Sequence, residues 1–370
     1  MIRTLTIIIL SISLQGCLGS KVTIKGKNNL KLQQVDFTQI SGWENDEQKM
    51  ALNAFIHSCD KFAKMPQNRE IASDLGSVTA GDFRDVCEIA EVVKIMDEKQ
   101  ARNFFENWFV PFSVKTRSGK TNGLFTGYYE ASLNGSRTKT DTFKYPIYKK
   151  PKDLGFDTYY TRKEINDGAL AGKRLELLYV DDPVDLFFMH IQGSGRVTLQ
   201  DGSTIRLGYA GKNNNPYTSI SRYLVDRGKI ASDQVNAITI KNWLKANPKE
   251  AQEIMNLNLA YTFFQISEDE NVIGAQNVPL TPQRSLAVDK EIIPYGFPLW
   301  VSTSIKNLEN SKKESFKKLM IAQDTGSAIK GTVRGDIFFG FGEAAENNAS
   351  LTASRGKYYI LLPVNVIDKL

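Results

Sequence analysis

The chain is long enough for two domains and has the composition of a globular protein. Its 370 residues exceed the usual size of one domain, and its 41% hydrophobic and 24% charged residues lie in the ordinary range. The net charge of +6 is small and spread along the sequence. No long basic run or arginine-aromatic cluster occurs, which argues against nucleic acid as a partner, whereas a mildly basic surface would suit an anionic polymer.

The first residues indicate export. Arg3 precedes an apolar run from Leu5 to Leu14, which is too short for a membrane span and predicts a signal peptide over residues 1–16. A small residue followed by Cys17 resembles a bacterial lipobox, which implies that Cys17 is lipidated and becomes the mature N-terminus. The alternative is an ordinary signal peptide with a coincidental cysteine. Leu18, in place of aspartate, resembles the signal for sorting to the outer membrane.

Cys59 and Cys87 are the two other cysteines. An exported protein passes through an oxidising space, so the pair can form a disulfide. Two buried thiols are an equal alternative, because Cys59 lies on the apolar face of an expected helix. Residues 17–39 are polar and lysine-rich without a helical period, and we expect them to form a tether.

The periodicity of apolar residues predicts a helical first part and a mainly β remainder. Apolar residues recur at helical spacing over 52–63 and over 101–109, and these aromatic stripes indicate core packing. Segments 196–199 and 204–207 flank an Asp-Gly turn and predict a hairpin. A helix is expected with Asn215 as its N-cap. Further expected elements are a helix over 238–246 and strands over 299–303, 319–323, 337–341 and 358–362.

Three aspartates in the last third offer acid and base chemistry. Asp289, Asp324 and Asp336 each lie at the edge of an apolar, strand-like run, so that they could converge on one site. The two histidines, His57 and His190, are far apart in the sequence, and carboxylates must therefore do the work in any enzyme built on this chain. The cysteine and histidine spacing of a metal site is absent, and we expect neither a metal nor a cofactor.

Several glycine-rich stretches also carry tyrosines and amides. Glycine lets a backbone approach a ligand closely, tyrosine offers a flat face with a hydroxyl, and an amide both donates and accepts hydrogen bonds. Each stretch alone is a common turn, but together they are suited to a saccharide. The candidate contacts are Tyr128, Tyr129, Gln192, Ser194, Tyr209 and Asn213.

Six motifs follow one another over nearly the whole chain from about residue 40. They are Gly127–Glu130, Gln192–Gly195, Tyr209–Asn213, Val278–Thr281, Arg284–Asp289 and Gln323–Gly331, followed by Asp336. In this order and spacing they resemble the membrane-bound lytic murein transglycosylase A family, including its C-terminal three-aspartate module. Ala131 stands where that family often has proline, and Ser327 where a second glycine is common. Neither departure removes a carboxylate.

The resemblance implies a mainly β fold with added helices. A double-psi β-barrel domain would comprise residues 40–130 and 268–370, with residues 131–267 inserted as a second, barrel-like β-domain and a glycan groove between the two. It implies further contacts at Thr281, Arg284 and Lys330. It also implies a monomeric outer-membrane lipoprotein that faces the periplasm and binds peptidoglycan glycan strands. Complexes that synthesise the cell wall are candidate partners.

The family likeness also implies a reaction. Similar proteins cleave the β-1,4 bond between N-acetylmuramic acid and N-acetylglucosamine without water and leave a 1,6-anhydromuramyl end. A hydrolase commonly needs two carboxylates, whereas attack by the sugar's own C6 hydroxyl lets one carboxyl act first as acid and then as base. By motif position this role falls to Asp336, with Asp324 and Asp289 beside it. A like-charged neighbour and a dry groove would raise the pKa of such an acid.

Other interpretations stay open on the sequence alone. Lys330 and Arg334 could pair with the aspartates and make the cluster structural. Asp324-Thr325-Gly326 matches the aspartic peptidase fingerprint, but the chain has no second copy, so a peptidase would require a homodimer. A non-catalytic murein-binding lipoprotein would keep the aromatic groove and lose the acid.

Overall fold

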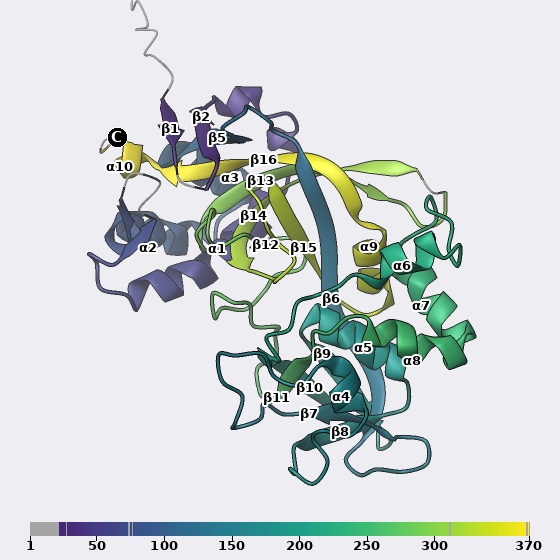
Figure 1. The fold of residues 1–370 in the computed structure, drawn as a ribbon. Helices are drawn as coiled ribbons and strands as arrows, with labels where there is room; N and C mark the ends of the chain where they lie inside the picture. Colours follow the sequence, from purple (N-terminus) through teal and green to yellow (C-terminus); the bar gives the residue numbers. More distant parts are fainter. Residues whose placement is uncertain are drawn as a thin grey trace, which may run out of the picture.

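The computed structural model describes residues 22–26, 28–72, 75, 77–310, 312–367 and 369 (Figure 1). The strands are β1 Thr23–Lys25, β2 Leu30–Gln34, β3 Glu70–Ala72, β4 Val78–Thr79, β5 Phe109–Thr116, β6 Gly123–Ser136, β7 Tyr145–Tyr148, β8 Glu176–Val180, β9 Gly195–Leu199, β10 Thr204–Lys212, β11 Thr262–Ser267, β12 Ser285–Val288, β13 Pro298–Lys306, β14 Lys313–Asp324, β15 Arg334–Phe341 and β16 Ala353–Pro363. The helices are α1 Gln48–Ala63, α2 Arg84–Val93, α3 Glu98–Trp108, α4 Arg162–Asn166, α5 Pro183–Gln192, α6 Ile220–Asp226, α7 Ala237–Ala246, α8 Pro248–Asn256, α9 Glu343–Leu351 and α10 Val364–Ile367, with 3-10 turns η1 Phe37–Gln39, η2 Trp43–Asn45 and η4 Ala80–Phe83.

Six strands form a closed circuit of pairings. β6 pairs with β15 and with β16, and from β15 the pairing continues through β12, β14 and β13 back to β16. The β6–β15 and β12–β14 pairs are parallel and the others antiparallel. The circuit leaves none of these six strands with a free edge at its paired residues. β5, β2 and β1 extend the sheet outward from β16.

β6 also connects this circuit to a second group of strands. Its residues 131–135 pair with β9, and residues 135–136 pair with β8. β9 continues to β10 and β11, and β8 pairs with β7. Figure 1 shows β6 as one long strand that runs from the β12–β16 group into the group formed by β7 to β11. The two groups therefore share a backbone element.

Most predicted elements are confirmed. The helices over 52–63 and 101–109 correspond to α1 and α3, the helix over 238–246 to α7, and the four late strands to β13 to β16. The predicted hairpin is confirmed, with Thr204 opposite Thr198. One helix start was wrong, since α6 begins after Ser219. Asn215 is instead held in the loop, where its side-chain amide donates to the Tyr159 carbonyl.

The expected tether differs from the structure from Thr23 onward. Within residues 17–39, β1 and β2 are strands, and β2 pairs with β5. Leu30 and Leu32 are buried, while Lys31 and Gln33, which alternate with them, are half-buried. This alternation is the strand period, which the high lysine content obscured. The expected signal peptide and Cys17 lie outside the described residues.

Helices α1 to α3 pack together on one side of the closed circuit, with α1 beside β14 (Figure 1). The structure joins Cys59 of α1 to Cys87 of α2 by a disulfide. Phe55 and Phe62 of α1 pack against Phe83, which links the helices to the aromatic core. In the part of the chain that the structure describes, no helix has the length and apolar character that crossing a membrane requires.

A buried ion pair fixes the strands that carry the site. Arg284, which precedes β12, is fully buried, and its two terminal nitrogens donate to the carboxylate of Asp46 at 2.7 and 2.9 Å. The same carboxylate accepts from the backbone N–H of Leu319 in β14 at 2.8 Å. Asp46 therefore ties the N-terminal 3-10 turns to β12 and β14.

We predict that Asp46→Ala lowers the free energy of unfolding by about 3–5 kcal/mol, because it leaves the Arg284 charge buried without a partner. Urea unfolding followed by tryptophan fluorescence measures the change. The control is Asp167→Ala. Asp167 pairs with Lys163 on the exposed surface, so this substitution should leave the midpoint of urea unfolding unchanged. Equal midpoints for the two variants would contradict the proposed anchoring role of Asp46.

Candidate active site

The sheet register places two of the three aspartates in one cross-strand row. Ala287 of β12 pairs with Asp324 at the end of β14 and with Asp336 of β15. Asp336 in turn pairs with Thr126 of β6. Directly paired residues project from the same face of a sheet. The two carboxylates therefore flank the small Ala287 side chain on one face.

Asp336 accepts a hydrogen bond from one side chain, which is itself oriented by a second one. The Thr126 hydroxyl donates to Asp336 Oδ1, and the same hydroxyl oxygen accepts from Arg334 Nη2 at 2.9 Å. A threonine hydroxyl has a single proton, so the contact with Arg334 leaves that proton for Asp336. Loss of surrounding water raises the pKa of Asp336 to about 6; the Arg334 charge and the Thr126 hydrogen bond oppose this rise, and the Asp324 charge adds to it.

Asp324 has more hydrogen-bond donors. Its Oδ2 accepts from the Tyr128 hydroxyl at 2.7 Å, and its Oδ1 accepts from the backbone N–H groups of Ala275 and Thr325, each at 2.9 Å. Burial raises the pKa of Asp324, while these three donors act in the opposite direction. Burial and the Asp324 charge hold the pKa of Tyr128 well above its usual value, so the phenol keeps its proton and donates it.

Asp289 is tied to the loop between β14 and β15. It is buried, and its Oδ2 accepts from the backbone N–H of Gly331 at 2.9 Å. Its Oδ1 accepts from Lys330 Nζ at 3.2 Å, an ion pair with an exposed lysine. Asp289 thus holds the loop that leads into β15 and Asp336. The sequence did not distinguish this arrangement from that of the other two aspartates.

A buried polar network supports Asp324 from behind. The Gln323 amide donates to the Ala54 carbonyl of α1 at 2.7 Å and to the Ser58 hydroxyl at 3.0 Å. Ser58 donates to Gln276 Oε1 at 2.8 Å, and the Gln276 backbone N–H donates to the Gln323 carbonyl. Gln276 follows Ala275, whose N–H binds Asp324, so α1 positions that donor. Sequence reasoning missed this network, although Gln323 in an otherwise apolar strand was a signal.

Among the predicted glycan contacts, several are accessible. Tyr209 of β10 is 55% exposed, and Lys330 is exposed beside Asp289. Thr281 and Gln192 are half-buried; the Gln192 side-chain oxygen accepts from the Tyr129 backbone N–H at 3.0 Å. Ser194, by contrast, is buried just before β9. Tyr128 reaches Asp324 directly, which brings one predicted contact to the aspartate row.

Three of the predicted contacts are themselves buried and bind other parts of the protein. The Tyr129 hydroxyl donates to Glu346 of α9 at 2.9 Å. The Asn213 amide donates to the carbonyls of Tyr160 and Leu259, each at 2.8 Å. Arg284 is bound to Asp46, as described above. These side chains hold loops and strands together, and sequence alone could not separate that support from contact with a ligand.

The same residues can be considered as metal ligands. Across the described ranges, with their gaps at the N-terminus and at single positions, no group of three histidine, cysteine, aspartate or glutamate residues is placed to hold a metal ion. Asp324 and Asp336 accept hydrogen bonds from hydroxyl and backbone groups. This arrangement suits proton transfer between a carboxyl group and a substrate oxygen.

Comparison with known proteins identifies relatives of this arrangement. A family model described as the MltA specific insert domain matches residues 124–265, and one described as the 3D domain matches residues 284–362. The second match contains all three aspartates.

One relative is the membrane-bound lytic murein transglycosylase A of Vibrio cholerae, which is 36% identical over 60% of this chain; the alignment spans 61% of that relative. The crystal structure of a membrane-bound lytic murein transglycosylase from Agrobacterium tumefaciens is similar with a TM-score of 0.80 at 32% identity, covering 91% of this chain and 99% of that one. The structure of Escherichia coli MltA with bound chitohexaose has a TM-score of 0.68 at 29% identity, covering 84% of this chain and 90% of that one. The chain belongs to the membrane-bound lytic murein transglycosylase A (MltA) family and carries a C-terminal 3D domain.

Proposed function

We propose that the protein is a peptidoglycan lytic transglycosylase. It cleaves the β-1,4 bond between N-acetylmuramic acid and N-acetylglucosamine and leaves a 1,6-anhydromuramyl end. The observation that carries this proposal is the row in which Asp336 and Asp324 flank Ala287 with unequal hydrogen-bond partners. Family membership and the chitohexaose bound to the E. coli relative support a glycan as the substrate.

In the proposed mechanism one carboxyl group serves both steps. Asp336 starts protonated, which its pKa of about 6 permits, and donates the proton to the glycosidic oxygen as the bond from that oxygen to C1 breaks. Its carboxylate then accepts the proton of the C6 hydroxyl as that oxygen bonds to C1. No water is consumed, and Asp336 ends protonated as it began. The negative charge of Asp324 would stabilise the positive charge that develops at C1.

The accessible polar and aromatic groups would hold the glycan strand. We assign direct contact to Tyr128 at the aspartate row and to Tyr209, whose exposed ring offers a stacking face. Gln192, Ser194, Thr281 and Lys330 are further candidate contacts. Tyr129, Asn213 and Arg284 are buried and support the site through their hydrogen bonds to other loops and helices.

The architecture fits two domains with a glycan groove between them. We propose that residues 40–130 and 268–370 form one domain and that its six-stranded circuit is a double-psi β-barrel. Residues 131–267 would then be an inserted, barrel-like β-domain. The closed order of pairings and its two parallel pairs support the first assignment. The match of the insert family model to residues 124–265 supports the second.

We further propose that the mature protein is a monomeric lipoprotein. Lipid on Cys17 would attach it to the outer membrane, facing the periplasm, where complexes that synthesise the cell wall are candidate partners. The lipobox-like sequence and the membrane-bound relatives support this location. Mass measurement of the mature N-terminus tests it, and an unmodified Cys17 would remove the anchor.

We predict that Asp336→Asn lowers the release of 1,6-anhydromuropeptides from murein sacculi by about 10²–10⁴-fold, the usual contribution of a general acid and base. Chromatography of the soluble products measures the rate. The control is Asp201→Asn, since Asp201 lies in the exposed turn between β9 and β10 and should not affect the rate. Full activity of Asp336→Asn together with loss in Asp324→Asn would reverse the two roles. Absence of product from the unmodified protein would favour a non-catalytic murein-binding protein.

The pH dependence of the reaction should report the acid. Because the active form carries a protonated Asp336, we predict that kcat/KM falls as the pH rises through about 6. The Thr126 hydroxyl stabilises the charged carboxylate, so Thr126→Val should raise the pKa of Asp336 and move this decline to higher pH. Thr138→Val, in an exposed loop, is the control. A decline that stays in place, or moves to lower pH, would contradict the proposed contact.

A further inference from the structure

A row of lysines crosses the outer sheet from its edge strand. Lys25 of β1 pairs with Lys31 of β2, and Lys31 pairs with Lys115 of β5. Residues paired in this way project from the same face of the sheet. Three strands therefore present their lysines side by side.

The row continues across the strands that follow. Ser302 of β13 pairs with both Lys357 of β16 and Lys317 of β14. Tyr359 of β16 pairs with Ser113 of β5, so these two side chains lie on one face. Lys357 and Lys115 each lie two residues from this pair and therefore project from the same face, because side chains alternate along a strand. Arg117 and Arg355 follow two residues further along the same face. We call the set the basic face, and its members are Lys25, Lys31, Lys115, Arg117, Lys317, Arg355 and Lys357.

The basic face lacks countercharges of its own. Within the described part of the chain, none of its seven cations forms an ion pair. Lys115 Nζ donates to the neutral Gln33 side chain and Lys317 Nζ to the Ser41 hydroxyl. No aspartate or glutamate occupies the positions of this face in β1, β2, β5, β13, β14 and β16. Neighbouring cations repel one another, and the face is therefore complementary to an external anionic surface.

A polar hollow opens on the same face. It has a volume of about 420 Å³, and its lining includes Ser302, Thr303 and Ser304 together with Arg355 and Lys357. Hydroxyl donors beside an arginine and a lysine match the oxygens of a phosphate group. The hollow therefore gives the basic face a place for a phosphate-bearing headgroup.

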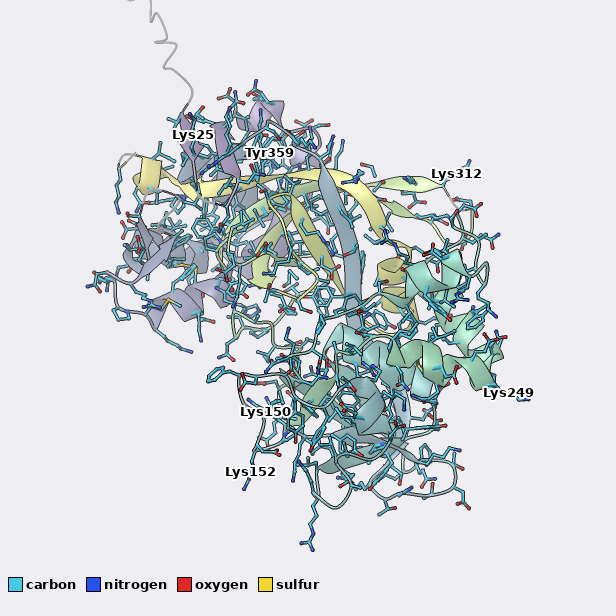
Figure 2. All side chains as sticks on the ribbon, in the orientation of Figure 1. Lys25, Lys150, Lys152, Lys249, Lys312 and Tyr359 are labelled. Carbon is cyan, nitrogen blue, oxygen red and sulfur yellow. A yellow bond between two sulfur atoms is a disulfide. The ribbon has the colours of Figure 1, made fainter. Side chains whose placement is uncertain are left out.

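The position of the N-terminal segment indicates which anionic surface the basic face meets. β1 is the outermost strand of the sheet and begins at Thr23. Cys17 precedes the first described residue, Val22, by five positions, a reach of at most about 18 Å for an extended chain. Figure 2 shows Lys25 and Tyr359 at the end of the molecule that carries β1, and Lys150, Lys152 and Lys249 toward the opposite end.

We propose that the basic face docks on the anionic phospholipid headgroups of the membrane that holds the N-terminus. This inference rests on the lipid attachment proposed above, which determines where the membrane lies relative to the protein. Lipid on Cys17 would bring β1 to the bilayer surface, and the lysine row would then orient the body. The second group of strands, β7 to β11, would point away from the membrane toward the murein.

Vesicle binding of the mature chain, residues 17–370, with Cys17→Ser tests the face without help from the lipid. The probe is vesicles containing phosphatidylglycerol, compared with neutral phosphatidylcholine vesicles. Each basic residue at an anionic surface raises binding about fivefold. Lys31→Gln, Lys115→Gln and Lys357→Gln combined should therefore lower the partition coefficient roughly a hundredfold. The matched control combines Lys150→Gln, Lys152→Gln and Lys249→Gln, which are exposed lysines away from the face, and should bind as before.

Equal loss in the two triple variants, or equal binding to charged and neutral vesicles, would overturn the proposal. So would a triple variant of the basic face that keeps vesicle binding and loses binding to murein sacculi, because the anion would then be the polymer. Unchanged release of product from soluble glycan strands shows that the variants are folded. This control also keeps the test of membrane binding separate from the test of the proposed activity. Vesicle binding that follows the predicted pattern supports the face even where no transglycosylase product forms.

Discussion

The position of β12 between β14 and β15 is the constraint on which the candidate site depends. Ala287 pairs with both Asp324 and Asp336. Its methyl group is a small side chain. A larger residue would stand between the carboxylates of Asp324 and Asp336. The register thereby lets the charge of one aspartate contribute to the raised pKa of the other.

The hydrogen bonds of Asp324 and Asp336 differ. Asp324 accepts from a phenol and two backbone N–H groups, which favour its charged form, whereas Asp336 accepts from a single hydroxyl. Two acids in one row thus have unequal surroundings, a pattern that separates a proton donor from an electrostatic neighbour. The buried Gln323 amide is paired at both its nitrogen and its oxygen, and the Gln276 side-chain oxygen accepts from Ser58. Such a network restricts the movement of the groups that it contacts.

Local sequence patterns predicted the elements that local spacing determines. Helix α1, the hairpin of β9 and β10, and strands β13 to β16 follow from apolar periodicity and turn residues. The polar content of Lys31 and Gln33 concealed β2, because only Leu30 and Leu32 face the core. The three aspartates could be identified as strand-edge carboxylates, but which pair shares a row depends on strand order. No local pattern fixes that order.

Long-range partners limited the prediction of the site in the same way. Arg284 in its motif is compatible with either a ligand contact or a buried pair, and its partner Asp46 lies 238 positions away. Ser58 and Gln276 are 218 positions apart, so their joint support of Asp324 could not be read from the sequence. The basic face likewise collects lysines from β1, β2, β5, β14 and β16, which are spread over almost the whole chain.

We propose above that one carboxyl group completes the reaction without water. The most direct measurement is mass spectrometry of the muropeptides released from sacculi in ¹⁸O-labelled water. We predict products that lack the mass of one water at the muramyl end and carry no label. Reducing ends that contain ¹⁸O would show hydrolysis and contradict it.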